Sequence, residues 1–149
     1  MKLAGKFDTI ISTPPPEQWT DLTLASAAAI QAVHGIRMPN LRTLIISVNQ
    51  ALVTLNASGL PALVTIHGPN CFTLADVRAA HCPGLKTVTL VNAALPTPNV
   101  DRLLADLVAN GTADGAITVA GGSSGPPSDP DGIASKLILI SRGWTVSTN

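Results

Sequence analysis

The sequence predicts an α/β solenoid built around one parallel sheet of about six strands. The first observation behind this prediction is a repeat of eleven residues in the middle of the chain. The second is a wider spacing in the C-terminal third, where two segments have helical patterns. The third is composition, because 46% of the 149 residues are hydrophobic and only 12% are charged. Such a chain can bury a large core under a sparsely charged surface.

The repeat is clearest between residues 41 and 95, which divide into five blocks of eleven residues such as "LRTLIISVNQA" and "LVTIHGPNCFT". The first position of the five blocks is always leucine, and we call each such aligned position a column. The fourth column reads Leu44, Leu55, Ile66, Val77 and Val88. The ninth column reads Asn49, Leu60, Cys71, Cys82 and Ala93. The same phase extends back to Ile30 and Trp19, which gives the pattern L-x-x-L-x-L-x-x-N/C-x-L.

This pattern is the signature of leucine-rich repeats, and residues 19–149 resemble a short leucine-rich-repeat protein of the bacterial and phage kind. The ending, with "VDRLLADLVANGTADGAITVAGG" and "RGWTV", is similar to a C-terminal pattern in uncharacterised bacterial and phage proteins. Those proteins are often encoded near phage structural components. The resemblance therefore implies a virion component, and it carries over no catalytic residue.

One coil of this family is longer than one block and takes two blocks, about 22 residues, within the family's usual range of coil lengths. Blocks starting at 19, 41, 63 and 85 are expected to form the main sheet, because "LRTLIIS" and "LKTVTLV" are rich in β-formers. The intervening blocks return along the opposite side. For residues 30–40 and 74–84 strand and short helix both stay open, since short apolar runs suit either.

The C-terminal third predicts helix, strand, glycine-rich loop, helix and strand. An apolar stripe from Val100 to Val108 predicts the first helix, with Asn99 capping its start and Gly111 its end. The second helix is expected at about residues 133–142, with Asp131 as N-cap. If Val88, Ile117 and Trp144 are equivalent inward positions, both C-terminal coils are wider than two blocks, and the last is slightly shorter than the one before it. These wider coils would carry helices on the convex side.

Composition excludes some function classes. Nine basic and nine acidic residues cancel without any basic run, which argues against a nucleic-acid binder. Phe7, Trp19, Phe72 and Trp144 are the only aromatic residues, and there is no tyrosine, which disfavours a surface that stacks bases or sugars. We expect no signal peptide, membrane span, metal or cofactor. The predicted location is the virion for a phage-encoded chain, and otherwise the cytoplasm.

The candidate reactive groups favour structural roles. Cys71 and Cys82 share the inward ninth column, so we expect buried, unpaired thiols rather than metal ligands. His81 next to Cys82 suggests a nucleophile pair, but adjacent strand residues point to opposite faces. Asp129 and Asp131 lack the spacing of a known calcium loop. The sequence therefore predicts a protein that is not an enzyme.

The outward columns of the main sheet form a threonine-rich, nearly uncharged surface, which we call the threonine face. Its residues are Thr43, Ile45, Thr65, His67, Thr87, Thr89, Thr118 and Thr145, taken from the third and fifth columns. Repeat proteins bind partners through such sheets, although threonine also suits any exposed strand position. We assign Ile45, His67, Thr89, Thr118 and Thr145 to the fifth column.

The two ends of a solenoid need covering. We expect the last strand to lie at one end of the solenoid without a capping segment, and residues 1–18 to be either a cap or an assembly arm. The β-like stretch with Phe7, Ile10 and Ile11 precedes three prolines, which suit a stiff spacer. We expect a structural protein that forms homo-oligomers or contacts other virion proteins through this arm and the terminal strand. The alternative is a recognition module that binds a ligand or receptor through the threonine face.

Overall fold

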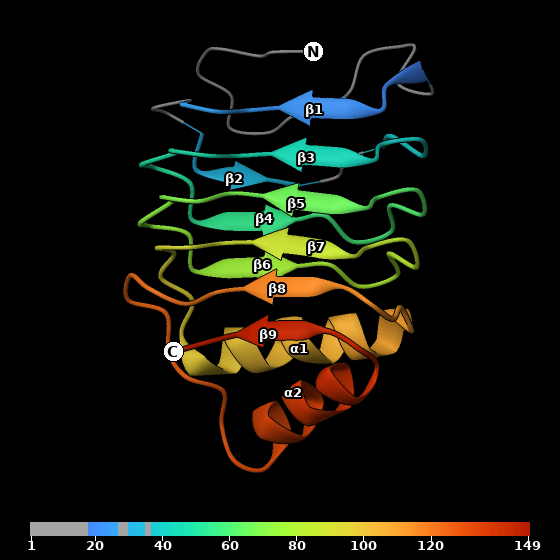
Figure 1. Ribbon diagram of the computed structural model, residues 1–149. Coiled ribbons are helices and arrows are strands. Elements are labelled where there is room, and N and C mark those ends of the chain that lie inside the picture. The colour runs from blue at the N-terminus through green and yellow to red at the C-terminus, as the bar shows by residue number, and fades with distance from the viewer. Residues whose placement is uncertain (1–17, 27–29, 35–36) are drawn as a thin grey trace.

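The chain folds into two parallel sheets and two helices, as a computed structural model of residues 18–26, 30–34 and 37–149 shows (Figure 1). The strands of the six-stranded sheet are, in spatial order, β1 (Asp21–Thr23), β3 (Thr43–Ile45), β5 (Thr65–His67), β7 (Thr87–Thr89), β8 (Ala116–Thr118) and β9 (Thr145–Ser147). The three-stranded sheet contains β2 (Ala32–Val33), β4 (Thr54–Asn56) and β6 (Asp76–Arg78). The helices are α1 (Thr97–Asn110) and α2 (Asp131–Ser141). The predicted α/β class and the parallel sheet of six strands are confirmed.

The pairing of the strands follows the repeat. Thr43 pairs with Thr65, and Thr65 pairs with Thr87, so these neighbouring strands of the larger sheet are two blocks apart in the sequence. In the smaller sheet Ala32 pairs with Thr54, and Thr54 pairs with Asp76, at the same spacing. The segments that sequence left open, residues 30–40 and 74–84, therefore contain strands β2 and β6.

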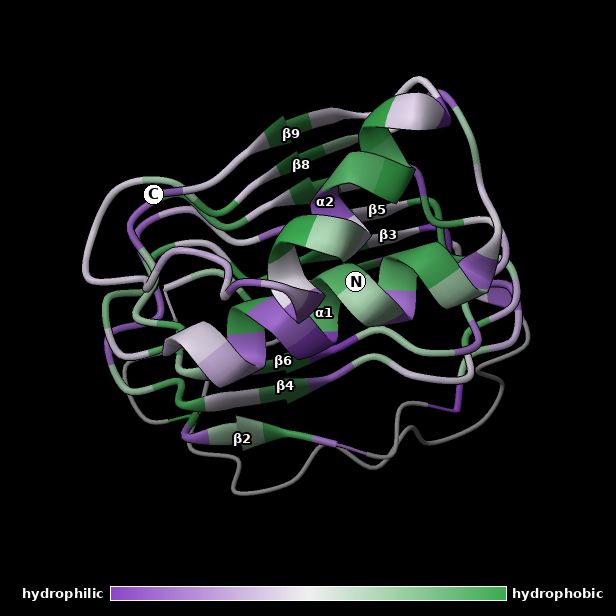
Figure 2. Ribbon diagram, turned by 90° about the horizontal axis from the view of Figure 1, so that it is seen from below, coloured by the Kyte–Doolittle hydropathy of each residue, from purple (hydrophilic) through white to green (hydrophobic). Residues whose placement is uncertain are grey.

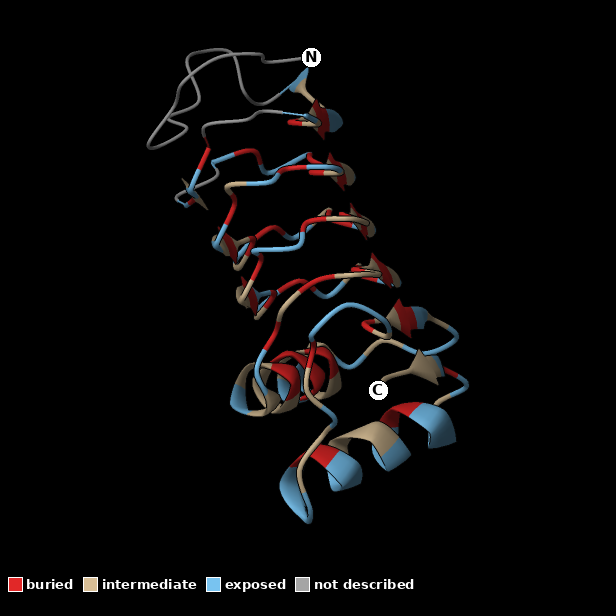
Figure 3. Cartoon of the chain, turned by 90° about the vertical axis from the view of Figure 1, so that its left-hand side faces the viewer, coloured by how far each residue is buried: buried red, intermediate tan, exposed pale blue. Residues whose placement is uncertain are grey.

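The core lies between the two sheets (Figure 3). In strands β3, β4, β5 and β7 a buried central residue stands between two half-buried ones, because successive side chains of a strand point to opposite faces. The first, fourth and ninth columns are all at most 1% exposed. Each leucine buried in this way contributes roughly 1.5–3 kcal/mol of transfer free energy.

Left-handed backbone turns recur with the same period as the repeat. The residues with positive φ include Ser26 (58°), Val48 (60°), Gly59 (76°), Asn70 (60°), His81 (57°) and Asn92 (62°). From Val48 onward these are the eighth residues of successive blocks. Glycine and asparagine tolerate this conformation, whereas a β-branched residue such as valine is strained in it.

The C-terminal spacing differs from the prediction. Val88 pairs with Ile117 and Ile117 pairs with Val146, so the last two steps are equal in length, and Val146 holds the position assigned to Trp144. Trp144 is also buried, but its Nε1 donates to the carbonyl oxygen of Thr112 at 2.9 Å. The indole needs this polar partner, which lies in the turn before β8 rather than in the sheet.

The predicted helix starts are wrong. Helix α1 begins at Thr97 after Pro96, and helix α2 begins at Asp131 after Pro130; neither start has a side-chain cap. Proline has a fixed φ that suits a helix start. Asn99 lies within α1 and Asp131 is the first residue of α2, instead of preceding them. Gly111 does follow the end of α1, with a φ of 78° and its N–H bonded to Val108.

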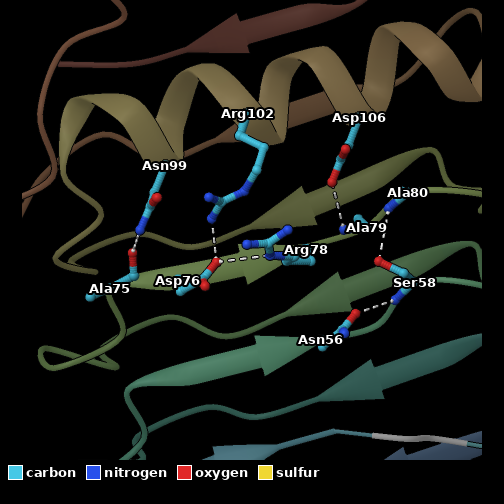
Figure 4. Close-up of polar contacts among 10 residues, drawn as sticks. All are labelled: Asn56, Ser58, Ala75, Asp76, Arg78, Ala79, Ala80, Asn99, Arg102 and Asp106. Atoms are coloured by element: carbon cyan, nitrogen blue, oxygen red, sulfur yellow. Dashed lines mark hydrogen bonds and ion pairs between the residues drawn. The ribbon is translucent and has the colours of Figure 1, made fainter.

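Helix α1 covers the open edge of the smaller sheet with polar side chains (Figure 4). Asn99 Nδ2 donates to the carbonyl of Ala75 at 2.7 Å, and Asp106 Oδ2 accepts from the N–H of Ala79 at 3.1 Å. Asn110 accepts from the N–H of Cys82 at 2.9 Å and donates to the carbonyl of Ala79 at 2.8 Å. These side chains take the place of a further strand beside β6.

Candidate functional site

The threonine face lies on the outward side of the larger sheet. Its members Thr43, Thr65 and Thr87 stand in one paired row, and Ile45, His67, Thr89 and Thr118 stand in the next. All seven are half-buried. In the described strands of this sheet, Asp21 is the only residue that is Asp, Glu, Lys or Arg.

One member of the face is in the wrong row. Thr145 pairs with Ala116, which itself pairs with Thr87, so Thr145 belongs to the third column instead of the fifth. Ser147 pairs with Thr118 and holds the fifth column. The cause is the same as for Trp144, because the last step between strands is longer than expected.

At the β1 end of the threonine face, the Asp21 carboxylate accepts hydrogen bonds from threonine side chains. Thr20 Oγ1 donates to Asp21 Oδ2 at 2.8 Å. Hydrogen bonds from Thr20 and from Thr43 lower the pKa of Asp21, since they stabilise its charged form. An open groove of about 520 Å³ begins here, with Asn40 and Arg42 among its lining residues. The described side chains that line it offer polar contacts, but neither histidine nor cysteine is among them.

The ninth column supplies buried hydrogen-bond donors. Asn49 Nδ2 donates to the carbonyl of Leu24 at 2.7 Å and to that of Ile46 at 2.6 Å. Cys71 Sγ donates to Ile46 at 3.0 Å. Asparagine and cysteine in this column thus have the same role, because both donate hydrogen bonds to backbone carbonyls inside the turn.

Both thiols are buried and unpaired, as predicted. Cys82 Sγ donates to the carbonyl of Ala57 at 3.2 Å. Burial raises the pKa of the Cys71 and Cys82 thiols, because desolvation penalises the thiolate. His81 is exposed while Cys82 is buried, so the two side chains do not form a nucleophile pair.

The carboxylates of Asp101 and Asp76 hold neighbouring segments of the fold together. Asp101 accepts from the N–H of Ser128 at 2.9 Å and from its hydroxyl at 2.6 Å, which ties the loop before α2 to α1. Asp76 pairs with Arg102 and, at 3.7 Å, with Arg78 (Figure 4). Within the described ranges no three His, Cys, Asp or Glu side chains gather to hold a metal ion. The Asp129 and Asp131 carboxylates stand on exposed residues.

The C-terminal end of the sheet has a surface that sequence reasoning missed. Helix α2 packs against α1 and β9 and buries Gly132 and Leu139. Its large apolar side chains are otherwise exposed, at 40% for Ile133, 59% for Leu137, 41% for Ile138 and 47% for Ile140. We call these four residues the α2 patch. Figure 2 shows this strongly hydrophobic helix beside β9.

The edge of β9 lies next to the α2 patch. Among the described strands, β9 pairs with β8 alone. The N–H of Thr145 bonds to the carbonyl of Gly115, and the carbonyl of Ser147 accepts from the N–H of Val119. Successive strand residues direct their backbone groups to alternate sides, so the N–H and C=O of Val146 point away from β8.

The signal for the α2 patch was present in the sequence. The segment "DGIASKLILISRG" places apolar residues around much of the helix, and such a helix needs cover on more than one side.

The predicted assembly arm, with Phe7, Ile10 and Ile11, lies outside the described residues. Neither described helix is long and apolar enough to cross a membrane.

Comparisons with models of known protein families, with curated proteins and with solved structures found no match for this chain.

Proposed function

We propose that this chain is a leucine-rich-repeat-like solenoid that works as a non-enzymatic structural protein in an assembly. The observation that carries the proposal is the C-terminal end, where the α2 patch adjoins the edge of β9. Among the described strands β9 pairs with β8 alone, and the four large apolar side chains of α2 beside it are exposed. Monomeric proteins usually protect such edges and avoid such patches.

The described side chains support a structural role over catalysis. The buried thiols donate to backbone carbonyls, and Asp101 and Asp106 bond to backbone N–H groups. These groups hold neighbouring segments of the fold together.

We assign the protein to a phage virion, on the strength of its resemblance to repeat proteins encoded beside phage structural components. The N-terminal arm is the second proposed contact. This assignment predicts that peptides of the chain occur in phage particles purified from a strain that carries the gene. Particles that lack the chain while containing the neighbouring structural proteins would contradict it.

The assembly role is tested by the solution mass of the full chain and of a chain that begins at Gln18. We expect an oligomer for the full chain and a smaller mass after truncation, measured by light scattering. Circular dichroism checks that the shorter chain is folded. A monomeric full chain at every concentration would rule out self-assembly, and the recognition module would then become the first candidate.

A recognition module that uses the threonine face is the second candidate. The observation in its favour is the continuous row of half-buried side chains, none of them Asp, Glu, Lys or Arg, across the neighbouring strands β3, β5, β7 and β8 of the larger sheet. Charged replacements of Ile45, His67 and Thr89 are then expected to abolish ligand or receptor binding without changing the solution mass. If the same replacements alter the mass, the face belongs to the assembly instead.

A further inference from the structure

We propose that residues 126–138, which comprise the end of the loop before α2 and most of α2 itself, form a flap that opens as a unit while the rest of the fold stays closed. Asp101 of α1 holds the flap in its closed position. Three residues of the α2 patch, Ile133, Leu137 and Ile138, lie on the flap, so the patch is complete only while the flap is closed. The inference concerns the flap itself and holds whether or not the α2 patch serves assembly.

The flap lies between two segments that are firmly held. Before it, Gly125 donates its N–H to the carbonyl of Leu95 at 2.7 Å, and the hydroxyl of the buried Ser124 accepts from the N–H of Leu95 at 3.2 Å. After it, the carbonyl of the fully buried Leu139 accepts from the N–H of the buried Trp144 at 3.0 Å. The flap can therefore open between these two segments without disturbing the paired strands.

Little apolar surface holds the flap against the rest of the protein. Within the flap only Gly132 is buried. Helix α1, by contrast, buries four large apolar residues: Val100, Leu103, Leu104 and Leu107. Figure 3 shows the same difference between the two helices at this end of the molecule. Because apolar burial is the main favourable term in folding, and segments with few buried apolar contacts open at low free energy, the flap should open before α1 does.

Polar contacts with Asp101 keep the flap closed. The Asp101 carboxylate accepts from the N–H of Ser128 at 2.9 Å and from its hydroxyl at 2.6 Å. Gly132 lies so close that a Cβ built on it would overlap Oδ1 of Asp101. The remaining hydrogen bond between the flap and the described chain outside α2 runs from Lys136 to the hydroxyl of Thr148 at 2.9 Å. Since hydrogen bonds to a carboxylate are stronger than neutral ones, Asp101 contributes most to closure.

The test is hydrogen exchange of the full chain, followed by mass spectrometry of peptides from the flap, α1 and β7. In the unchanged chain we expect the amides of residues 133–138 to exchange faster than those of residues 100–107. Asp101→Ala should speed exchange of the flap about tenfold, because two hydrogen bonds to a carboxylate are lost, and should leave α1 and β7 unchanged. Ser141→Ala is the control, since it removes a hydroxyl of α2 that bonds within the helix, to the carbonyl of Ile138.

A second variant separates the hydroxyl of Ser128 from its N–H. Ser128→Ala removes one of the two bonds to Asp101, so we expect it to speed exchange of the flap less than Asp101→Ala does. In a chain that already carries Asp101→Ala it should add nothing, because both changes remove the same contact. An equal effect of Ser128→Ala in both backgrounds would overturn the role of Asp101.

Two further results would overturn the flap. One is equal exchange of the flap and α1 in the unchanged chain. The other is an Asp101→Ala variant in which all segments speed up alike, because the C-terminal end would then open only together with the whole fold. Neither result bears on the solution mass, so light scattering still decides the proposed function separately.

Discussion

Val48 is a residue whose side chain conflicts with its backbone. It has a φ of 60°, and the equivalent residues two and four blocks later are Asn70 and Asn92. Asn92 Nδ2 donates to Asn70 Oδ1 at 2.8 Å, so asparagine in this column both fits the turn and links neighbouring turns. Valine can do neither.

Replacing Val48 should therefore stabilise the protein. We expect Val48→Asn to raise the free energy of unfolding by about 1 kcal/mol, the lower end of the cost of left-handed backbone in an ordinary residue. Urea titration measures the change. Val53→Asn is the control, because Val53 has a similar exposure, 45% against 44%, without a positive φ. Equal effects of the two substitutions would show that polarity, and not backbone strain, is responsible.

The two buried thiols predict a dependence of stability on pH. Burial raises the pKa of Cys71 and Cys82, so the native state keeps these protons to higher pH than the unfolded chain does. The stability they contribute is complete below the unfolded thiol pKa, roughly 8.5, and is lost as the pH rises toward the folded value. The Cys71→Ala, Cys82→Ala variant should show a flatter decline of unfolding free energy over that range. If the unfolding free energy of the double variant declines as steeply as that of the unchanged chain, groups other than these two thiols cause the decline.

At the scale of elements, α1 acts as a polar substitute for a strand. Its side chains bond to the backbone of the segment around β6 and leave its apolar side for the core, where Val100, Leu103, Leu104 and Leu107 are buried. This pairing explains why the chain changes from strand to helix after β7 without exposing the edge of the smaller sheet.

Asp106 tests this role. Asp106→Ala leaves the N–H of Ala79 without its acceptor, and we expect a loss of about 1–3 kcal/mol in unfolding free energy. Asp106→Asn retains an amide oxygen at that position and should lose less. Thermal or urea unfolding compares them. If both variants lose the same amount, the carboxylate charge matters more than the bond to the edge.

The elements also show where sequence reasoning succeeds. The inward columns predicted the strands of the larger sheet within the repeat, because a fixed period of eleven residues determines which positions face inward, and Leu44, Ile66 and Val88 are buried accordingly. Whether residues 30–40 and 74–84 are strand or helix did not follow from the same columns. In the last third there is no such period. The sequence analysis places Trp144 at the inward position of the last strand, whereas the sheet register selects Val146. Asn99 looked like a cap, but tertiary contact with Ala75 uses its amide inside the helix.

At the scale of the whole molecule, the two candidate surfaces differ in how far sequence could locate them. The threonine face follows from strand alternation, so all but Thr145 were placed in the correct row. The α2 patch depends on which side of the helix packs inward, since α2 has apolar residues on more than one side. That choice is made by contacts with α1 and β9, and a helical pattern alone does not contain it.

The central claim is that the C-terminal end holds this protein in an assembly. The most direct test is the mass of the full chain by light scattering, compared with that of a Leu137→Lys, Ile140→Lys variant. Val53→Lys, at an exposed apolar residue in the segment before β4, is the control. The account predicts an oligomer whose mass falls in the α2 variant and stays constant in the control. An α2 variant with the mass of the unchanged chain would contradict it.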